Sequence, residues 1–251
     1  MLLEKFFSIV KTLSSACSNK KTAASFILIL MAMCLLPDEL GGVTILVRSL
    51  SLDNSSYHKM LRFFKSKAFC LDTLISIWHH WVFCHFKPVM FNDCHVYFLD
   101  GHDAPKSGKK IPGVRSLHSA SNNNSKKEFF MGHSWQVLTK AVTANGKIFA
   151  TYITSKISDG IIIGPRQKKT LFDDVKIMIE KISFPPNSLI IADSYYYCRH
   201  MMLDLRQRGL TLITRVARNA VAYDMAELKK TEKRGRPPIY GKKISNRSGG
   251  F

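Results

Sequence analysis

Acidic residues are scarce in this chain, and it also lacks closely paired cysteines and long hydrophobic runs. Its 251 residues contain 18 Asp and Glu against 37 Lys and Arg, a formal net charge of +19 at pH 7. So basic a balance is a poor match to a metabolic enzyme and favours a polyanionic partner. Nucleic acid is therefore the first partner to consider.

The cysteines are scattered along the sequence, and no two of them form a C-x-x-C pair. This spacing argues against a disulfide framework and against a standard zinc module. A reducing cytoplasm is the expected compartment. The six residues are Cys17, Cys34, Cys70, Cys84, Cys94 and Cys198.

The longest apolar run, "AASFILILMAMCLL", covers 23–36 and stops at Pro37-Asp38. A membrane-spanning helix needs ~18 to 20 such residues, so the run is too short to cross a bilayer. It also starts far from the N-terminus for a signal peptide and lacks a clear cleavage pattern. It is therefore interpreted as a buried helix.

Two short apolar runs each stop on an aspartate. "VYFLDGHD" reaches Asp100, and "SLIIADSYYY" reaches Asp193. Runs of this composition fit strands that are covered on both faces, and such sheets place ligands just beyond the carboxyl ends of their strands. The alternative is that each Asp only starts a turn or caps a helix.

Residues 1 to about 90 are expected to be helical. Within "SSYHKMLRFFK", Ser55 or Ser56 is the candidate N-cap, and Tyr57, Leu61 and Phe64 recur at helical spacing. The result is an amphipathic helix with a basic face. It is either a DNA-contacting helix or an ordinary surface helix with solvated lysines. The candidate DNA contacts are Tyr57, His58 and Arg62.

The segment "WHHWVFCHF", followed by Cys94-His95, is rich in residue types that bind metals. Bulky aromatics separate them, and no two have the spacing of a zinc finger. An aromatic core helix is the preferred interpretation. The residues concerned are His79, His80, Cys84, His85, Cys94 and His95.

A long polar loop is predicted after Asp100, because Gly, Pro, Ser and Asn dominate residues 101–128. Asn145-Gly146 then separates two strand-like runs, which predicts a tight hairpin. The basic residues of the loop are candidate DNA contacts: Lys106, Lys109, Lys110, Arg115, Lys126 and Lys127.

The second half of the chain alternates between helix and strand. "KKTLFDDVKIMIEKI" reads as a helix with Thr170 and Asp173 at capping-box spacing, ended by Pro185-Pro186. "YYYCRHMMLDLRQRG" reads as a second helix ended by Gly209, and "LTLITRVARN" as a further strand. The predicted order is strand, hairpin, helix, strand, helix, strand.

This order resembles that of RNase H-like nucleases, and its motifs make the chain similar to a DDE transposase of a bacterial insertion sequence. The resemblance runs from roughly residue 43 to 243. The motifs that carry it are "SSYHKMLRFF", "FLDGHDAPKSGKKIPGV", "GHSWQVL", "LIIADSYY", "LITRVARNA" and "KRGRPPIYGKK". It implies Mg²⁺- or Mn²⁺-dependent DNA strand cleavage and transfer.

The resemblance also implies a fold and a domain division. The fold is α/β: an RNase H-like mixed sheet with flanking helices, preceded by a small helical domain. Residues 1–90 would form the DNA-binding helical domain and 91–222 an incomplete catalytic core. Residues 223–251 would begin an insertion region and end in a ragged tail. In the core, Asp100 would bridge two metal ions and Asp193 would hold one.

The family pattern includes a third acid, normally Glu, on a later helix beyond a strand-rich insertion. We expect the helix that should bear it to be absent from this sequence, and the chain to be a truncated, catalytically impaired copy. Glu227 is a weak candidate for the third acid, because it lies before the landmark "KRGRPPIYGKK".

Further DNA contacts are expected late in the chain. Arg234 and Arg236 lie in "KRGRPP", which resembles an AT-hook but also fits a basic loop of the insertion. Arg215 and Arg218 follow a strand and are candidates for phosphate contact. Tyr195 to Tyr197 are candidates for stacking on bases, with helix packing expected for at least one of them.

The expected partners are double-stranded DNA, as element ends and target, and a second copy of the chain in a dimer. The expected location is the cytoplasm, on the nucleoid, with no membrane association. A non-catalytic remnant that occupies element ends or pairs with full-length transposase is the main alternative. A phosphatase of the haloacid dehalogenase type is weaker, because it needs D-x-D whereas Asp100 and Asp103 are spaced D-x-x-D.

Overall fold

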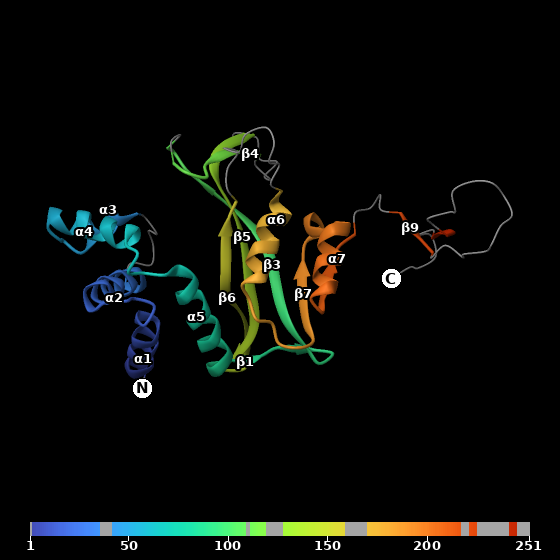
Figure 1. The fold of residues 1–251 in the computed structure, drawn as a ribbon, viewed down its shortest axis with the longest axis horizontal. Coiled ribbons are helices and arrows are strands. Elements are labelled where there is room, and N and C mark those ends of the chain that lie inside the picture. The colour runs from blue at the N-terminus through green and yellow to red at the C-terminus, as the bar shows by residue number, and fades with distance from the viewer. Residues whose placement is uncertain are drawn as a thin grey trace.

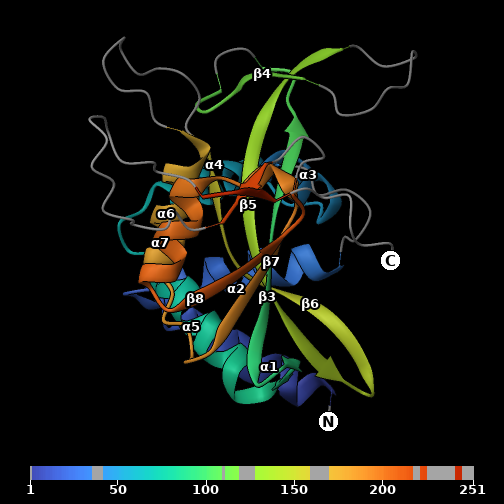
Figure 2. The same cartoon turned by 90° about the vertical axis from the view of Figure 1, so that its right-hand side faces the viewer.

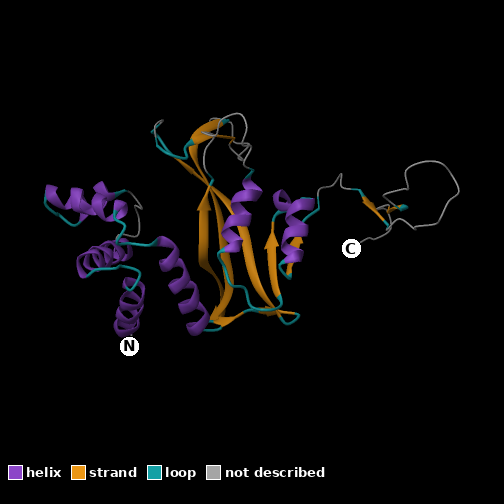
Figure 3. Ribbon diagram, in the orientation of Figure 1, coloured by secondary structure: helices purple, strands orange, loops and turns teal. Residues whose placement is uncertain are grey.

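The computed structural model describes residues 2–35, 42–108, 111–118, 128–158, 170–216, 221–224 and 241–244. Helices come first, followed by a sheet with two further helices (Figure 1, Figure 3). The five leading helices are α1 (Leu2–Ser14), α2 (Lys20–Leu35), α3 (Val43–Ser49), α4 (Asn54–Lys65) and α5 (Leu71–His85).

Helices α1 to α5 share a hydrophobic core of their own. Phe69 packs against it, with its ring 5.8 Å from that of Phe26 on α2 and 5.0 Å from that of Phe63 on α4. Aromatic pairs at such distances add to the stabilisation that burial of their surface gives. This part of the chain therefore has an apolar centre independent of the sheet.

Helix α4 corrects two details of the prediction. Its N-cap is Asp53, whose carboxylate accepts a 2.9 Å hydrogen bond from the Ser56 backbone N–H and a 2.6 Å bond from the Ser55 hydroxyl. A charged carboxylate is the stronger acceptor, so it takes the cap and the serines become its donors. The buried side of α4 is formed by Met60 and Phe63, with Phe64 56% exposed.

Helix α2 contains the longest apolar run and is 16 residues long. One side of it is buried through Phe26, Ile29 and Ala32, while Leu28 and Met33 on the other side are exposed. The expected burial is thus correct for one side only. No helix within the described ranges is long and apolar enough to cross a membrane.

The sheet is mixed, with β6, β5, β3, β7 and β8 in that order across it. β5 pairs antiparallel with both β3 and β6, and β7 and β8 run parallel to β3. This is the RNase H-like strand order, so the predicted fold class is confirmed. The bounds are β3 (Cys94–Pro105), β5 (Phe129–Ala144), β6 (Lys147–Ile157), β7 (Ser188–Ala192) and β8 (Leu210–Thr214).

Short strands complete the picture. β1 (Lys87–Pro88) pairs with β5, β2 (Met90–Phe91) pairs with β3, and β4 (Arg115–His118) pairs with β5. A separate antiparallel pair consists of β9 (Ala222–Tyr223) and β10 (Lys243–Ile244).

Local sequence signals located several boundaries correctly. Asn145 and Gly146 have φ values of 49° and 72°, as the two-residue turn between β5 and β6 requires. Thr170 and Asp173 form the predicted capping box of α6 (Leu171–Glu180). Helix α7 (Arg199–Gln207) is followed by Gly209 with a φ of 73°. The helix expected from Tyr195 onward instead begins as the 3₁₀ turn η1 (Ser194–Tyr196).

One face of the sheet carries the main core. Helices α5, α6 and α7 all pack on it, through residues such as Val82, Val175 and Leu205 (Figure 2). The opposite face carries a smaller cluster built on Val96, Ala141 and Leu189. Successive residues of a strand point to opposite faces, so β3 alternates between the two clusters.

The polar segment after Asp100 is more ordered than predicted. β3 continues to Pro105, and β4 and the first residues of β5 pair beyond it, forming a three-stranded arm of 101–108, 111–118 and 128–136. Three strands meet at Gly132, where an added Cβ would lie 2.7 Å from the Ala104 carbonyl oxygen. Polar residues on a strand exposed on both faces show no alternation, so their composition resembled that of a loop.

Candidate active site

Asp100 and Asp193 occupy adjacent positions at one edge of the sheet. The parallel pairing of β3 and β7 ends with Leu99 opposite Ala192, and each aspartate is the next residue of its chain. Strand alternation places Asp100 on the face of Val96 and Phe98. The sequence therefore predicted correctly that these aspartates follow neighbouring parallel strands, although β3 itself does not end at Asp100.

The backbone around each aspartate holds one oxygen of its carboxylate. Asp100 Oδ1 accepts a 2.8 Å hydrogen bond from the Gly101 N–H, and Asp193 Oδ1 accepts a 3.0 Å bond from the Tyr195 N–H. The carbonyl oxygen of Asp193 also accepts a 2.5 Å bond from Thr214 Oγ1. Among the described residues, Oδ2 of either carboxylate has no hydrogen bond or ion pair. Asp193 thus caps a turn and still presents an oxygen to a ligand.

A buried polar pair lies close to the two carboxylates. The Tyr196 hydroxyl donates a hydrogen bond to Gln136 Oε1, and both side chains are almost completely buried. Burial raises the pKa of Tyr196, and the negative charges of Asp100 and Asp193 raise it further. The hydroxyl therefore stays protonated, close enough to both carboxylates to respond to their charge.

The donor set suits a hard divalent cation. Both carboxylates are solvent-exposed, and Mg²⁺ is commonly bound by one or two carboxylates while water and substrate phosphate complete its coordination. Within the described ranges, no group of three or more Asp, Glu, His or Cys side chains is placed to hold a metal ion. Asp100 and Asp193 would hold such an ion together.

Arg215 lies at the same edge of the sheet. β7 and β8 pair in parallel with Ala192 opposite Thr214, so Arg215 takes the position beside Asp193. Its side chain is exposed. A guanidinium here can contact a phosphate bound at the carboxylates, because Arg presents several donors in a fixed fork.

The carboxylate edge can be compared with known proteins. Residues 163–249 match a family described as DDE superfamily endonuclease. The matched part contains Asp193, and Asp100 precedes it. No curated protein sequence matches this one.

A solved structure is also similar to this chain. It is the cryo-EM structure of a piggyBac transposase synaptic complex with hairpin DNA. The TM-score is 0.40 and the sequence identity 15%, over 80% of this chain and 43% of that one. This chain thus spans less than half the length of that transposase chain.

The candidate DNA contacts on α4 lie apart from the carboxylates. Figure 1 shows α4 among the leading helices, away from the edge where β3 and β7 meet. Arg62 and His58 are exposed, whereas Tyr57 packs against the helical core and meets the His58 ring edge-on at 5.4 Å. A DNA contact there is a second surface, not part of the metal site.

The arm carries two further candidates, Lys106 and Arg115. The Lys106 backbone N–H donates a 2.8 Å hydrogen bond to the Met131 carbonyl, which leaves its exposed side chain free to reach solvent. Arg115 is half-buried on β4. The other sequence-based candidates lie outside the described residues: Lys109, Lys110, Arg218, Glu227, Arg234 and Arg236, together with Lys126 and Lys127 of the arm.

The three consecutive tyrosines have different surroundings. Tyr196 is buried beneath the carboxylates, as expected for at least one of the three. Tyr195 is exposed and stacks on Phe172 of α6 with ring centres 6.1 Å apart. Tyr197 is also exposed. Tyr195 and Tyr197 remain candidates for contact with bases.

Two buried polar residues of β5 were not predicted from the sequence. Gln136 and Lys140 lie on the core-facing side of β5, in alternation with Leu138 and Val142. Lys140 is 1% exposed, its Nζ lies 3.1 Å from the centre of the Phe83 ring, and burial lowers its pKa to about 8. Residues 136–142 show no alternation of polar and apolar residues, so no local signal reveals that Gln136 and Lys140 are buried.

The aromatic and histidine-rich segment forms α5. His79 packs edge-on against Phe83 at 4.7 Å, and His85 stacks on Trp81 at 4.3 Å. Burial, and then the positive charge of Lys140, lower the pKa of His79 to about 4. His79 is thus a neutral core residue at pH 7.

Proposed function

We propose that this chain carries the metal-binding edge of a DDE-type transposase, a protein that cleaves and joins DNA strands at the ends of an insertion sequence. The observation that carries the proposal is the parallel register of β3 and β7, which brings Asp100 and Asp193 side by side. The net charge of +19 and the match of residues 163–249 to DDE endonucleases support it.

The residues at this edge suit phosphodiester chemistry. Bound Mg²⁺ or Mn²⁺ supplies activation of the attacking hydroxyl and stabilisation of the leaving oxygen. Asp100 and Asp193 hold the cation, and Arg215 binds the adjacent phosphate and orients it. Tyr196 and Gln136 form a buried hydrogen bond close to the carboxylates. Accurate placement at this site matters, because misplacement of about 1 Å can cost on the order of a hundredfold in rate.

A second, narrower function is favoured by the size of the ligand set. Two carboxylates converge here, and none of the described residues adds a third ligand. We propose that this chain binds the cation weakly and binds element-end DNA, but cleaves the DNA poorly. It would then occupy element ends or pair with a full-length transposase as a dimer. Glu227, which lies outside the described residues, remains the candidate for a third acid.

A nicking assay with supercoiled DNA tests this proposal. Purified protein with Mg²⁺ or Mn²⁺ should produce no more nicks than its Asp100→Ala variant, because a cation held by two carboxylates leaves the reacting oxygens poorly aligned. Both proteins should still bind the DNA, which a mobility shift measures.

The opposite result has a clear signature. Robust nicking that disappears in Asp100→Ala, Asp193→Ala and Glu227→Gln alike would contradict impairment and identify Glu227 as the third acid. Nicking that persists in Asp100→Ala and Asp193→Ala would contradict the metal site itself. Asp103→Ala is the matched control, because Asp103 is an exposed carboxylate three residues along the same strand.

A further inference from the structure

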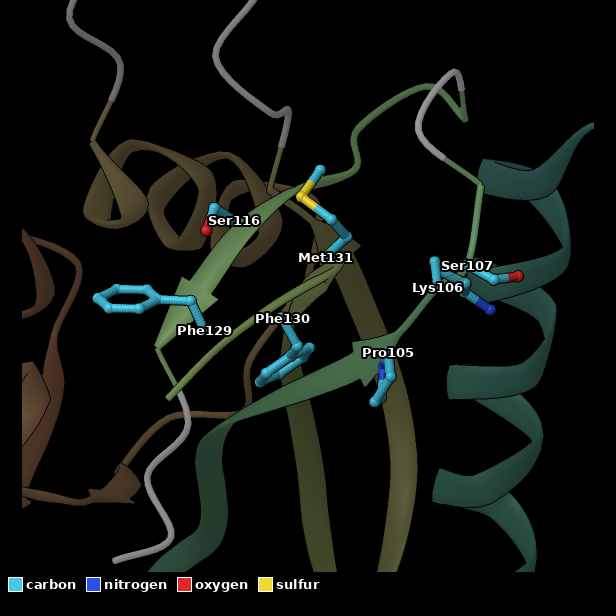
Figure 4. Close-up of a pocket in the computed structure, with 7 residues that line it drawn as sticks. All are labelled: Pro105, Lys106, Ser107, Ser116, Phe129, Phe130 and Met131. Atoms are coloured by element: carbon cyan, nitrogen blue, oxygen red, sulfur yellow. The ribbon is translucent and has the colours of Figure 1, made fainter. Parts of the chain in front are cut away.

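The arm beyond Asp100 contains a hollow that the metal site does not use. Its volume is about 670 Å³, and strands β3, β4 and β5 with the residues next to them supply its walls. Figure 4 shows Phe129 and Ser116 on one side of it, Pro105 and Lys106 on the other, and Phe130 and Met131 between them. The lining is completed by Ser107.

The hollow is lined by apolar side chains that belong to none of the hydrophobic clusters of the described residues. Phe129 is 56% exposed and lies outside the hydrophobic clusters of the described residues. Its ring meets His118 edge-on at 5.2 Å, which leaves ring faces available. Phe130 and Met131 are half-buried beside it. An exposed aromatic ring can stack on any nucleobase, because every base has a π-face.

The arm is also strongly basic. Residues 101–136, which include the arm, contain six Lys and Arg and two acids, Asp103 and Glu128. The carboxylate of Glu128 has a partner within the arm, because its Oε1 lies 3.6 Å from His118 Nε2. Lys106 reaches solvent at the rim of the hollow. Basic residues beside an exposed aromatic ring fit the phosphate and the base of one nucleotide.

We infer that the arm binds an unpaired nucleotide of the DNA substrate, with its base on Phe129 and its phosphate on Lys106. This inference rests on the proposed function, because it assigns a subsite to the same substrate. A paired base inside a duplex has both faces covered by its neighbours, so only an unpaired or extruded base can enter the hollow.

The distance along β3 indicates where this nucleotide lies. Lys106, which holds the phosphate, directly follows β3 and is six residues beyond Asp100, which corresponds to about 20 Å at a rise of about 3.3 Å per residue. A DNA strand advances about 3.4 Å per nucleotide, so the bound nucleotide is about six nucleotides from the phosphate at the carboxylates.

Fluorescence of 2-aminopurine tests the subsite. The probe is a DNA duplex in which 2-aminopurine is unpaired about six nucleotides from an element end, compared with the same duplex in which it is paired. The variants are Phe129→Ala, Phe129→Trp and Phe149→Ala. Phe149 is the matched control, since it is 48% exposed on β6 near the Asn145-Gly146 turn, at the other end of β5.

The full chain and Phe149→Ala should bind the unpaired probe about tenfold more tightly than the paired one and quench its fluorescence, because stacking contributes about 1–3 kcal/mol per base. Phe129→Ala should lose the preference and the quenching while binding the paired duplex unchanged, and Phe129→Trp should retain both. Equal binding of both probes by the full chain, or an unchanged preference in Phe129→Ala, would overturn the inference alone. No binding to either probe would overturn the proposed function as well.

Discussion

Raising the salt from about 50 to about 200 mM should weaken binding of this protein to duplex DNA by about a thousandfold, if about six phosphates are contacted. Each Lys or Arg that neutralises a phosphate releases a condensed counterion, so the logarithm of the affinity falls linearly with the logarithm of the salt concentration. The net charge of +19 and the exposed Lys and Arg side chains of α4, the arm and the sheet edge motivate this expectation. Fluorescence anisotropy at several salt concentrations measures the slope.

Single substitutions identify which surfaces contribute. Arg62→Ala, Lys106→Ala and Arg215→Ala should each reduce the slope by about 1, because each removes one phosphate contact. Lys181→Ala is the matched control, since Lys181 Nζ lies 2.7 Å from an Asp72 carboxylate oxygen and its charge is already paired. A flat salt response, or an equal loss of slope in Lys181→Ala, would contradict the proposed DNA contacts.

Lys140→Met should raise the free energy of unfolding by about 1–3 kcal/mol at pH 7. Burial lowers the pKa of Lys140 from its usual value near 10.5 to about 8, so at pH 7 the protein holds a charge that its surroundings disfavour. Methionine fills a similar volume without that charge. The lost contacts of Nζ with the Phe83 and Tyr97 rings offset part of the gain.

The pH dependence has a definite sign. Between about pH 8 and 10.5 the unfolded chain binds the Lys140 proton more readily than the folded protein does, so the stability of the unmodified protein rises with pH in that window. The advantage of Lys140→Met should therefore be complete below pH 8 and fade toward pH 10.5. Urea unfolding at pH 7 and pH 10 measures it, with the exposed Lys181→Met as control. Destabilisation by Lys140→Met at pH 7 would show that the charge is favourably solvated.

The sequence revealed the parts of the site that depend on local or strongly patterned signals. The aspartates were visible because each ends a continuous apolar run, and the turn at Asn145-Gly146 because both residues tolerate a positive φ. Pairing of the two aspartates followed from the parallel topology that the order of elements implies. These features require little knowledge of long-range contacts.

What the sequence could not reveal depends on partners distant in the chain. β3 continues to Pro105 because it pairs with β5, where Gly132 lies opposite Pro105. A polar strand without alternation gives no sequence signal of such pairing. The buried amide of Gln136 is satisfied by Tyr196, a residue 60 positions away. At α4 the predicted N-cap was wrong, because the carboxylate of Asp53 is a stronger hydrogen-bond acceptor than the hydroxyls of Ser55 and Ser56.

Binding of Mn²⁺, followed by electron paramagnetic resonance, tests most directly whether Asp100 and Asp193 form one metal site. The full chain should bind Mn²⁺, and Asp100→Asn, Asp193→Asn and the double variant should all lose nearly the same affinity, because ligands of one ion are energetically coupled. Asp103→Asn, an exposed carboxylate on the same strand, should bind Mn²⁺ like the unmodified chain. Unchanged binding in either single variant at the site, or an equal loss in Asp103→Asn, would contradict a metal ion shared by these two aspartates.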